Sequence, residues 1–335
     1  RDRYRHVIEE IARRSHVTEQ EIAHAAIDMA RAAGAGCPEH VGYYLIDAGR
    51  PSLEARVGYR PTVRQHLRGS VFRRPARAYL GGIALGTVVI LAVPLALAIP
   101  SSADSIRLAA IFVLCLLALV PASELAIQVV NFVLAATLYP QPLPKLAFTD
   151  GVPDEWQTLV VVPTMLVSPD SIQKDLEHLE IRHLANRDAN LQFALLADLA
   201  DAAEREMAED AALIEAAVRG IEQLNARYAG HGFALFFRPR RWSETEHCWM
   251  GWERKRGKLE ELNAWLTGEA GPSSATLRPI AGDESRLEGV RFVITLDADT
   301  QLPHGTARRL IGTLAHPLNR PRLAADGRRV IGGYT

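Results

Sequence analysis

Cysteine is scarce in this sequence, and its three copies, Cys37, Cys115 and Cys248, stand far apart. No two of them have the C-x-x-C spacing that zinc sites and redox motifs use. An odd, scattered set also argues against a disulfide framework, because such a framework pairs an even number of cysteines. We therefore expect the soluble parts of the chain in a reducing, cytoplasmic compartment.

Net charge is also nearly absent, at -1, but the charges are unevenly distributed. The stretch from Arg50 to Arg77 holds eight arginines and a single acid, Glu54. An uncharged apolar stretch follows directly, so the basic segment is interpreted as a signal of membrane topology. We expect a lipid bilayer as a partner, and no nucleic acid.

Charged residues are missing from Leu80–Pro100. At roughly 1.5 Å per helical residue, this run matches the apolar core of a bilayer. A second apolar run, Leu108–Tyr139, contains Pro121 and Glu124 and is expected as a second span joined to the first by a tight turn. The positive-inside rule places the segment before the spans in the cytoplasm, and two spans return the chain there. A pair of buried core helices is the alternative for both runs.

Residues 2–33 have the apolar periodicity of two amphipathic helices. Thr18 and Glu21 have the spacing of a capping box at the start of the second helix, and Gly34–Pro38 ends it. This pattern predicts a helical cytosolic module ahead of the spans.

Strands and helices alternate after a linker that is stiffened by prolines at positions 140, 142 and 144. This order predicts an α/β domain with a largely parallel sheet. The expected strands are Thr158–Val162, Leu191–Ala197, Phe233–Phe237 and Arg291–Leu296; the expected helices include Ser171–Leu184 and Ala202–Ala229, and Thr267–Glu288 is expected as a loop. The predicted organisation is a basic helical segment (1–78), two transmembrane helices (79–139), a proline-rich linker (140–157) and the α/β domain (158–335).

Four aspartates follow predicted strands: Asp198, Asp201, Asp297 and Asp299. In an open α/β sheet, ligands bind beyond the carboxyl ends of the strands. Asp297 and Asp299 form a D-x-D pair, whose hard oxygen ligands suit Mg²⁺ or Mn²⁺. Such a metal neutralises charge on a leaving diphosphate. The pattern therefore predicts a metal-assisted site for a nucleotide-activated sugar.

Other candidate residues have two interpretations each. Asp198 and Asp201 are placed to accept hydrogen bonds from a uracil and a ribose, or to cap a helix. Lys258, after a glycine at a helix start, is placed to meet phosphate, or it is a solvated helix charge. Three tryptophans either line a sugar site or are core or interface residues: Trp242, Trp249 and Trp252.

Longer strings of residues resemble processive glycosyltransferases of the GT-A fold, which is Rossmann-like. These strings are Val-Val-Val-Pro163, Leu-Leu-Ala-Asp198-Leu-Ala-Asp201, Arg-Gly-Lys258-Leu-Glu-Glu-Leu-Asn263 and Leu-Asp297-Ala-Asp299. With the membrane pair, two further strings resemble the cyclic β-1,2-glucan synthases of Gram-negative bacteria more narrowly: His40-Val-Gly-Tyr-Tyr-Leu-Ile-Asp47 and Phe236-Phe-Arg-Pro-Arg-Arg-Trp242. The resemblance covers nearly the whole chain.

This resemblance implies an inverting transfer of glucose from UDP-glucose to a growing β-1,2-glucan. The reaction would take place at the bacterial inner membrane, with the transferase domain in the cytoplasm. It implies that Asp198 and Asp201 hold the uridine, that Lys258 and Asp297 bind the donor, and that Asp297 and Asp299 bind Mg²⁺ or Mn²⁺. The family's general base lies later in the domain and is not recognisable in this chain. We therefore expect a fragment that is inactive alone.

Two other functions remain open. A phosphatase-like hydrolase uses D-x-D-x-[TV] after a strand, but this sequence has Gln301 four residues after Asp297, and its motif comes late in the domain. A non-catalytic membrane scaffold with a degenerate nucleotide-binding domain would also lack the general base.

Overall fold

The computed structural model describes residues 2–33, 39–62, 74–98, 105–138, 142–228, 232–269 and 276–333. Contacts divide the chain into two compact units, 1–142 and 143–335. Several predicted features lie outside the described residues: Cys37, the helix end at 34–38, the arginines between positions 63 and 73, the turn between the two spans, and Pro140.

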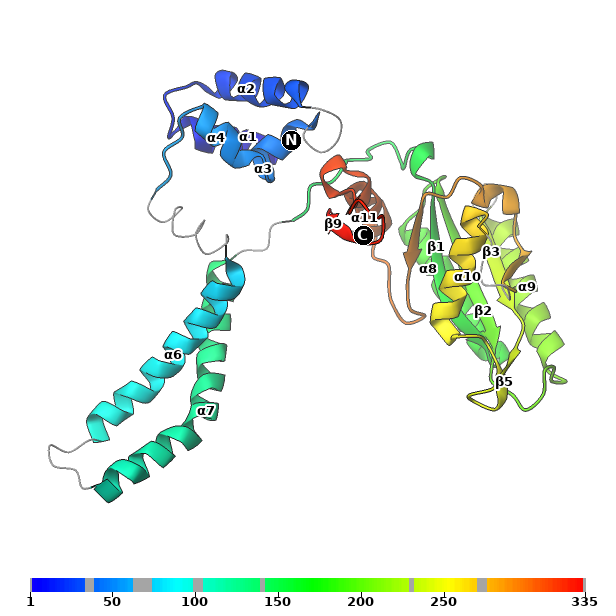
Figure 1. Ribbon diagram of the computed structural model, residues 1–335. Coiled ribbons are helices and arrows are strands. Elements are labelled where there is room, and N and C mark those ends of the chain that lie inside the picture. The colour runs from blue at the N-terminus through cyan, green and yellow to red at the C-terminus, as the bar shows by residue number, and fades with distance from the viewer. Residues whose placement is uncertain are drawn as a thin grey trace. The chain divides into compact units, whose positions relative to one another are not determined.

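The first unit contains a small helical core (Figure 1). Its helices are α1 (Asp2–Ala12), α2 (Glu19–Ala32), α3 (Val41–Ile46) and α4 (Arg50–Arg56). Ile11, Ile22 and Leu53 are fully buried where these helices meet. The predicted capping box is confirmed, because the Thr18 backbone N–H donates to Glu21 Oε2 over 2.7 Å and the Thr18 hydroxyl accepts from the Glu21 N–H. The short helices α3 and α4 were not predicted.

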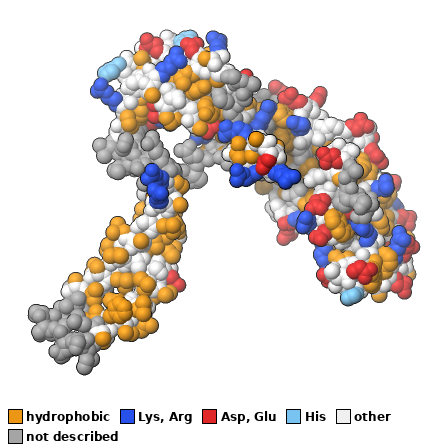
Figure 2. All heavy atoms as spheres, viewed as in Figure 1, with side chains coloured by type: hydrophobic (Ala, Val, Ile, Leu, Met, Phe, Trp, Pro, Cys, Tyr) orange, Lys and Arg blue, Asp and Glu red, His pale blue; other side chains and the backbone are white. Residues whose placement is uncertain are grey.

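Two long apolar helices follow, α6 (Pro75–Ala98) and α7 (Ser105–Thr137). Both are long and apolar enough to cross a membrane, over Pro75–Val93 and Ala109–Thr137. Hydrophobic side chains cover their visible surface (Figure 2). Only 6% and 11% of the two windows are buried, whereas the core helices of a soluble protein bury most of their apolar side chains. The buried-core alternative is therefore wrong for the part of the chain that the structure describes.

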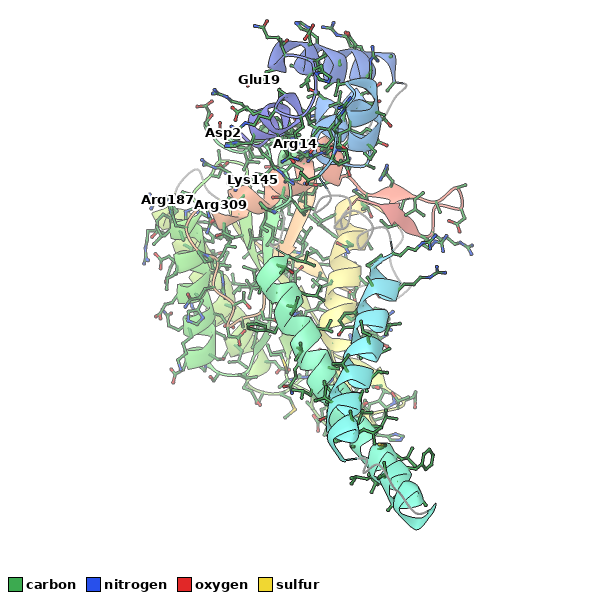
Figure 3. All side chains as sticks on the ribbon, turned by 90° about the vertical axis from the view of Figure 1, so that its left-hand side faces the viewer. Asp2, Arg14, Glu19, Lys145, Arg187 and Arg309 are labelled. Atoms are coloured by element: carbon green, nitrogen blue, oxygen red, sulfur yellow. The ribbon has the colours of Figure 1, made fainter. Side chains whose placement is uncertain are left out.

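Small residues line the contact between α6 and α7, which run side by side (Figures 1 and 3). Gly82 and Gly86 on α6 face Val130 and Ala126 on α7, and Ala126 is 1% exposed. A methyl group at Gly86 would lie 3.2 Å from the Ala126 Cβ. In lipid, helices associate by close backbone approach of this kind, since burial of apolar surface supplies no driving force there. A hydrogen bond of 3.1 Å from the Tyr79 hydroxyl to Asn131 also joins the two helices.

Replacing Gly86 by isoleucine should separate α6 from α7, because the branched side chain has no room against Ala126. We expect cysteines introduced at Tyr79 and Asn131 to be joined less efficiently by a short bifunctional thiol reagent in this variant. The control is Gly81→Ile, because a side chain at Gly81 meets nothing within 4 Å. Equal cross-linking in both variants would contradict this packing.

The second unit is built on a five-stranded sheet with the order β6-β3-β2-β1-β7. Its strands are β1 (Thr158–Leu166), β2 (Leu191–Leu199), β3 (Phe233–Arg238), β6 (Arg278–Ala281) and β7 (Phe292–Thr295). β1, β2, β3 and β7 are parallel, and β6 pairs antiparallel with β3. The predicted α/β class with a mostly parallel sheet is therefore confirmed. The prediction of an uninterrupted loop over 267–288 is wrong, since that segment contains β6.

Helices cover both faces of this sheet (Figure 1). α8 (Pro169–Ala185), α9 (Asp210–Arg227) and α11 (Thr306–Ala315) share one hydrophobic core, and α10 (Arg254–Thr267) packs on the other. The chain builds β1, β2 and β3 in one direction and then returns past β1 to β7. This change of direction creates a topological switch point between β1 and β7, where open α/β sheets bind their ligands.

The remaining elements are short. They are the 3₁₀ helices η2 (Asp154–Trp156), η3 (Glu284–Leu287) and η4 (Pro317–Asn319), and the hairpins β4–β5 (Arg241–Ser243 and Cys248–Met250) and β8–β9 (Arg322–Leu323 and Val330–Gly332). The helix predicted over 202–229 is half right. α9 begins only at Asp210, because Ala202 pairs with Trp249 of β5 through two backbone hydrogen bonds of 2.9 Å.

Candidate functional site

Asp198 lies near the carboxyl end of β2 and is buried. The sheet register sets it opposite Arg238 of β3. The Arg238 guanidinium holds the carboxylate in a bidentate pair, with Nε donating to Oδ1 and Nη2 donating to Oδ2, each over 2.9 Å. A buried pair of this kind is retained only when its other hydrogen-bonding groups are also satisfied.

Lys258 reaches the same carboxylate from α10. Its Nζ lies 3.2 Å from Asp198 Oδ2 and donates to the backbone oxygens of Thr164, over 2.7 Å, and Leu196, over 3.2 Å. Burial lowers the pKa of the Lys258 ammonium, and the negative charge of Asp198 opposes this shift. The alternative of a solvated helix charge is therefore wrong, because this ammonium ties α10 to β1 and β2.

Glu261, also on α10, supplies the second negative charge, so that the charges of Arg238 and Lys258 are both balanced. Its Oε1 accepts a hydrogen bond of 3.3 Å from Arg238 Nη1, and its Oε2 accepts the backbone N–H groups of Thr276 and Leu277 over 2.6 and 2.7 Å. Two acids and two cations therefore lie buried together without net formal charge. We call these four side chains the buried ion network: Asp198, Arg238, Lys258 and Glu261.

Two glycines allow the backbone to approach the buried ion network. A methyl group at Gly251 would lie 2.6 Å from Asp198 Oδ2. One at Gly257 would lie 2.0 Å from the Trp252 carbonyl oxygen and 2.8 Å from Arg238 Nη1. Any other residue at either position would push these groups apart. The start of α10 can therefore pack against the buried ion network only with glycine at both positions.

Asp201 lies nearer the surface than Asp198. Its side chain is 33% exposed, and its Oδ2 is 2.8 Å from Nη2 of Arg254. Neither aspartate caps a helix, because β2 runs through Asp198 and α9 begins after Glu209. The capping alternative is therefore wrong for both residues.

Asp297 and Asp299 follow β7 at the carboxyl edge of the sheet, in a segment that we call the acidic turn (residues 297–300). The Thr300 N–H donates to the Asp297 carbonyl over 3.0 Å, and both carboxylates are exposed. Asp297 forms an ion pair with Lys255 of α10. Asp299 lines a cavity of about 300 Å³ together with α8 side chains that include His178. The two carboxylates are thus flanked by helices from opposite faces of the sheet.

Arg182 of α8 holds the acidic turn by its backbone. Its Nη2 donates to the carbonyls of Ala298, over 2.6 Å, and Thr300, over 2.8 Å, and its Nε donates to Thr300 over 3.0 Å. Burial lowers the pKa of Arg182, and the nearby carboxylates of Asp175 and Asp299 oppose the shift. Its Nη1 is buried and has no hydrogen-bond partner among the described residues.

The donor set at the acidic turn is two exposed carboxylates. Among the described residues, no group of three or more His, Cys, Asp or Glu side chains is placed to hold a metal ion. Mg²⁺ and ions like it are commonly bound by one or two carboxylates, with substrate phosphates and waters as the other ligands. The residues present therefore fit an ion that is completed by a substrate diphosphate, and do not fit a closed protein-only site.

The first turns of α10 bring a cation to three of the four aspartates at this edge of the sheet. The pairs are Arg254 with Asp201, Lys255 with Asp297, and Lys258 with Asp198. Lys258 is buried, whereas Arg254 and Lys255 have side chains that are 59% and 50% exposed. Arg254 and Lys255 therefore face solvent at this edge, with Lys255 beside the acidic turn, and the sequence patterns had identified neither as a site residue.

A second buried ion pair fixes the β4–β5 hairpin and the loop before α9. Arg240 binds Asp210 through both terminal nitrogens, and Nη2 donates to Oδ1 over 3.0 Å. Its Nε donates to the carbonyl of Ala200. Burial acts to raise the pKa of Asp210, but the hydrogen bonds from Arg240 and the Met207 backbone, together with the positive charge of Arg240, outweigh burial and leave that pKa below its ordinary value of 3.8.

The three tryptophans gather around this hairpin. Trp242 and Trp249 face each other across the strands, with ring centroids 5.9 Å apart in an edge-to-face arrangement. Trp252 precedes α10 and lines a hollow together with Trp242. Trp242 is 44% exposed, so the core alternative does not describe it.

The mostly parallel sheet, with acidic residues at its carboxyl edge and two apolar helices ahead of it, fits a membrane-associated GT-A-like domain. No family model matches the chain. The chain is 38% identical to the cyclic β-(1,2)-glucan synthase NdvB of Rhizobium meliloti (strain 1021), over 345 aligned positions that take in the whole chain. It spans 12% of the length of that relative. The resemblance to cyclic β-1,2-glucan synthases is thereby confirmed, and the chain is similar to a segment of such a synthase.

Replacing Arg182 by methionine should loosen the acidic turn, because two carbonyls would lose a buried, charged donor. We expect a loss of about 3 kcal/mol in the free energy of unfolding. Hydrogen exchange at the Thr300 amide should also become faster. Arg309→Met is the control, because Arg309 is exposed on α11. Unchanged exchange at Thr300 in the Arg182 variant would refute this role.

Replacing Asp210 by asparagine should destabilise the fold in a pH-dependent way. The depressed pKa means that the Asp210 carboxylate stabilises the folded state above pH 3.8 and that this contribution is lost as the pH falls through the folded pKa. The variant should lose about 3 kcal/mol at pH 7, and the difference from the wild type should shrink below pH 3.8. Urea unfolding at a series of pH values measures this, with Glu215→Gln on the exposed face of α9 as the control. A difference that is constant with pH would contradict the assignment.

Proposed function

We propose that this chain carries the donor-binding part of a membrane-anchored glycosyltransferase. It would transfer glucose from UDP-glucose to a growing β-1,2-glucan, with inversion, at the bacterial inner membrane and with the α/β unit in the cytoplasm. The observation that carries the proposal is the acidic turn, which follows β7 beside the switch point and is flanked by Lys255 of α10. The name of the relative, a cyclic β-(1,2)-glucan synthase, supports the product class.

Asp198 and Asp201, at the end of β2, contribute to the uridine site in different ways. Asp201 is the more exposed of the two and is placed to accept hydrogen bonds from the ribose or the uracil. Asp198 is 5% exposed, and both of its oxygens accept from Arg238. Its contribution is therefore mainly to hold the end of β2 in place. Lys258 supports the same strand end through its contacts with Asp198 and the Leu196 carbonyl.

The diphosphate of the donor lies between the acidic turn and the start of α10. Asp297 and Asp299 would hold Mg²⁺ or Mn²⁺, which supplies Lewis-acid stabilisation of the leaving diphosphate when bound. Lys255 lies beside Asp297 with half of its side chain exposed, so its ammonium is placed to bind a phosphate oxygen. Inverting transfer also needs a general base for the acceptor hydroxyl, and we assign that role to none of the described residues.

Replacing Asp299 by alanine should remove the metal dependence of donor binding. Calorimetric titration of the wild type with UDP-glucose should give tighter binding with Mn²⁺ than without it, because the metal joins the carboxylates to the diphosphate. In Asp299→Ala, we expect Mn²⁺ to strengthen binding by less than about one tenth of the wild-type factor.

The control is Glu288→Ala, which removes an exposed carboxylate at the opposite, amino end of β7. It should keep the full effect of Mn²⁺. An Asp299 variant that keeps this effect would refute the metal assignment. A wild type that binds no UDP-glucose at all would instead support the scaffold alternative.

A further inference from the structure

The β4–β5 hairpin and the start of α10 enclose a hollow that the donor site does not use. It has a volume of about 360 Å³, which lies within the range of small-molecule sites. Its lining combines an indole surface with hydroxyl, carboxylate and guanidinium groups. The residues that matter below are Trp242, Trp252, Ser243, Glu246, Glu253 and Arg254.

We infer that this hollow is a glucan-binding subsite, in which glucosyl units of the acceptor or product chain stack on Trp242. The inference rests on the proposed function for the choice of a glucan. An aromatic ring exposed as Trp242 is, at 44%, offers an apolar face to the C–H groups of a pyranose. The surrounding hydroxyl, carboxylate and guanidinium groups supply the donors and acceptors that sugar hydroxyls need.

The charge of the lining favours a neutral ligand. The hollow is lined by two arginines, Arg241 and Arg254, and by two glutamates, Glu246 and Glu253. The hollow therefore has no net positive charge with which to attract a diphosphate, in contrast to the cations at the acidic turn. A sugar chain fits this balance better than a second nucleotide does.

The β4–β5 hairpin, which carries Trp242, is held in place by contacts with other segments. A two-stranded hairpin alone is marginally stable. Here Trp249, the cross-strand neighbour of Trp242, exchanges two backbone hydrogen bonds of 2.9 Å with Ala202. Arg240, just before β4, is fixed by its ion pair with Asp210. Because the hairpin backbone does not have to be ordered on binding, stacking on Trp242 costs less conformational entropy than stacking on a mobile loop.

The hollow also borders the donor site. Arg254 lines the hollow and is ion-paired with Asp201, which we assign to the uridine. Glu253 and Arg254 both have positive φ, 49° and 46°, so the backbone at this boundary is strained. Strain of this kind persists where the surrounding structure over-determines it, and it clusters at ligand sites. A glucan in the hollow would thus be separated from the uridine site by the side chain of Arg254.

The probe is sophorose, the β-1,2-linked disaccharide of glucose, titrated by calorimetry and tryptophan fluorescence. Replacing Trp242 by alanine should weaken sophorose binding by about tenfold or more, because the stacking surface is lost. Trp242→Phe should restore most of the affinity. Leu310→Ala is the matched control, because Leu310 is also 44% exposed but lies on α11. If Trp242→Ala fails to fold, Glu246→Gln, at an exposed position, should still weaken sophorose binding severalfold by removing an acceptor charge.

Sophorose binding that is equal in the wild type, Trp242→Ala and Glu246→Gln would overturn the inference. So would a Trp242 variant that loses UDP-glucose binding and keeps sophorose binding, since the hollow would then belong to the nucleotide. A wild type that binds UDP-glucose with Mn²⁺ but no sophorose would refute the subsite alone. Failure of both ligands to bind would refute the proposed function.

Discussion

The ion pair between Asp198 and Arg238 is the interaction on which the site depends. It joins the ends of β2 and β3, and through Lys258 and Glu261 it fixes α10 to β1 and to the segment before β6. Removing one member would leave an uncompensated buried charge, which typically destabilises a protein by about 3–5 kcal/mol. Replacing all four members by apolar side chains would remove that penalty, but also the contacts that set where α10 begins.

The position of α10 decides the electrostatics of the surface above it. Because the helix starts beside the sheet edge, Arg254 and Lys255 reach Asp201 and Asp297 while remaining half exposed. The edge of the sheet therefore presents acidic and basic side chains close to one another. A diphosphate and a divalent metal suit such a surface, since each finds groups of opposite sign within a short distance. The separate hollow at the hairpin has balanced charges and suits a neutral chain.

Hydrophobic patterns in the sequence predicted the two apolar helices, the parallel strands and the aspartates at their carboxyl ends. They predicted these features because each depends on local periodicity. The extension of β2 through Asp198 could not be predicted, since an aspartate in a buried strand is tolerated only through Arg238 of another strand. An arginine in the apolar strand β3 was the available signal. β6 and the late start of α9 depend on pairing with distant segments. Arg182 is likewise recognisable only from its contacts with the acidic turn, more than a hundred residues away.

Arg254, Lys255 and Lys258 share one helix, and this has a consequence for how the edge responds to a ligand. Residues on a helix move as a rigid body, so a rotation or slide of α10 would change all three ion pairs in the same event. Because Lys258 is held in the buried ion network, a ligand at this edge meets Arg254 and Lys255 at positions that are set together.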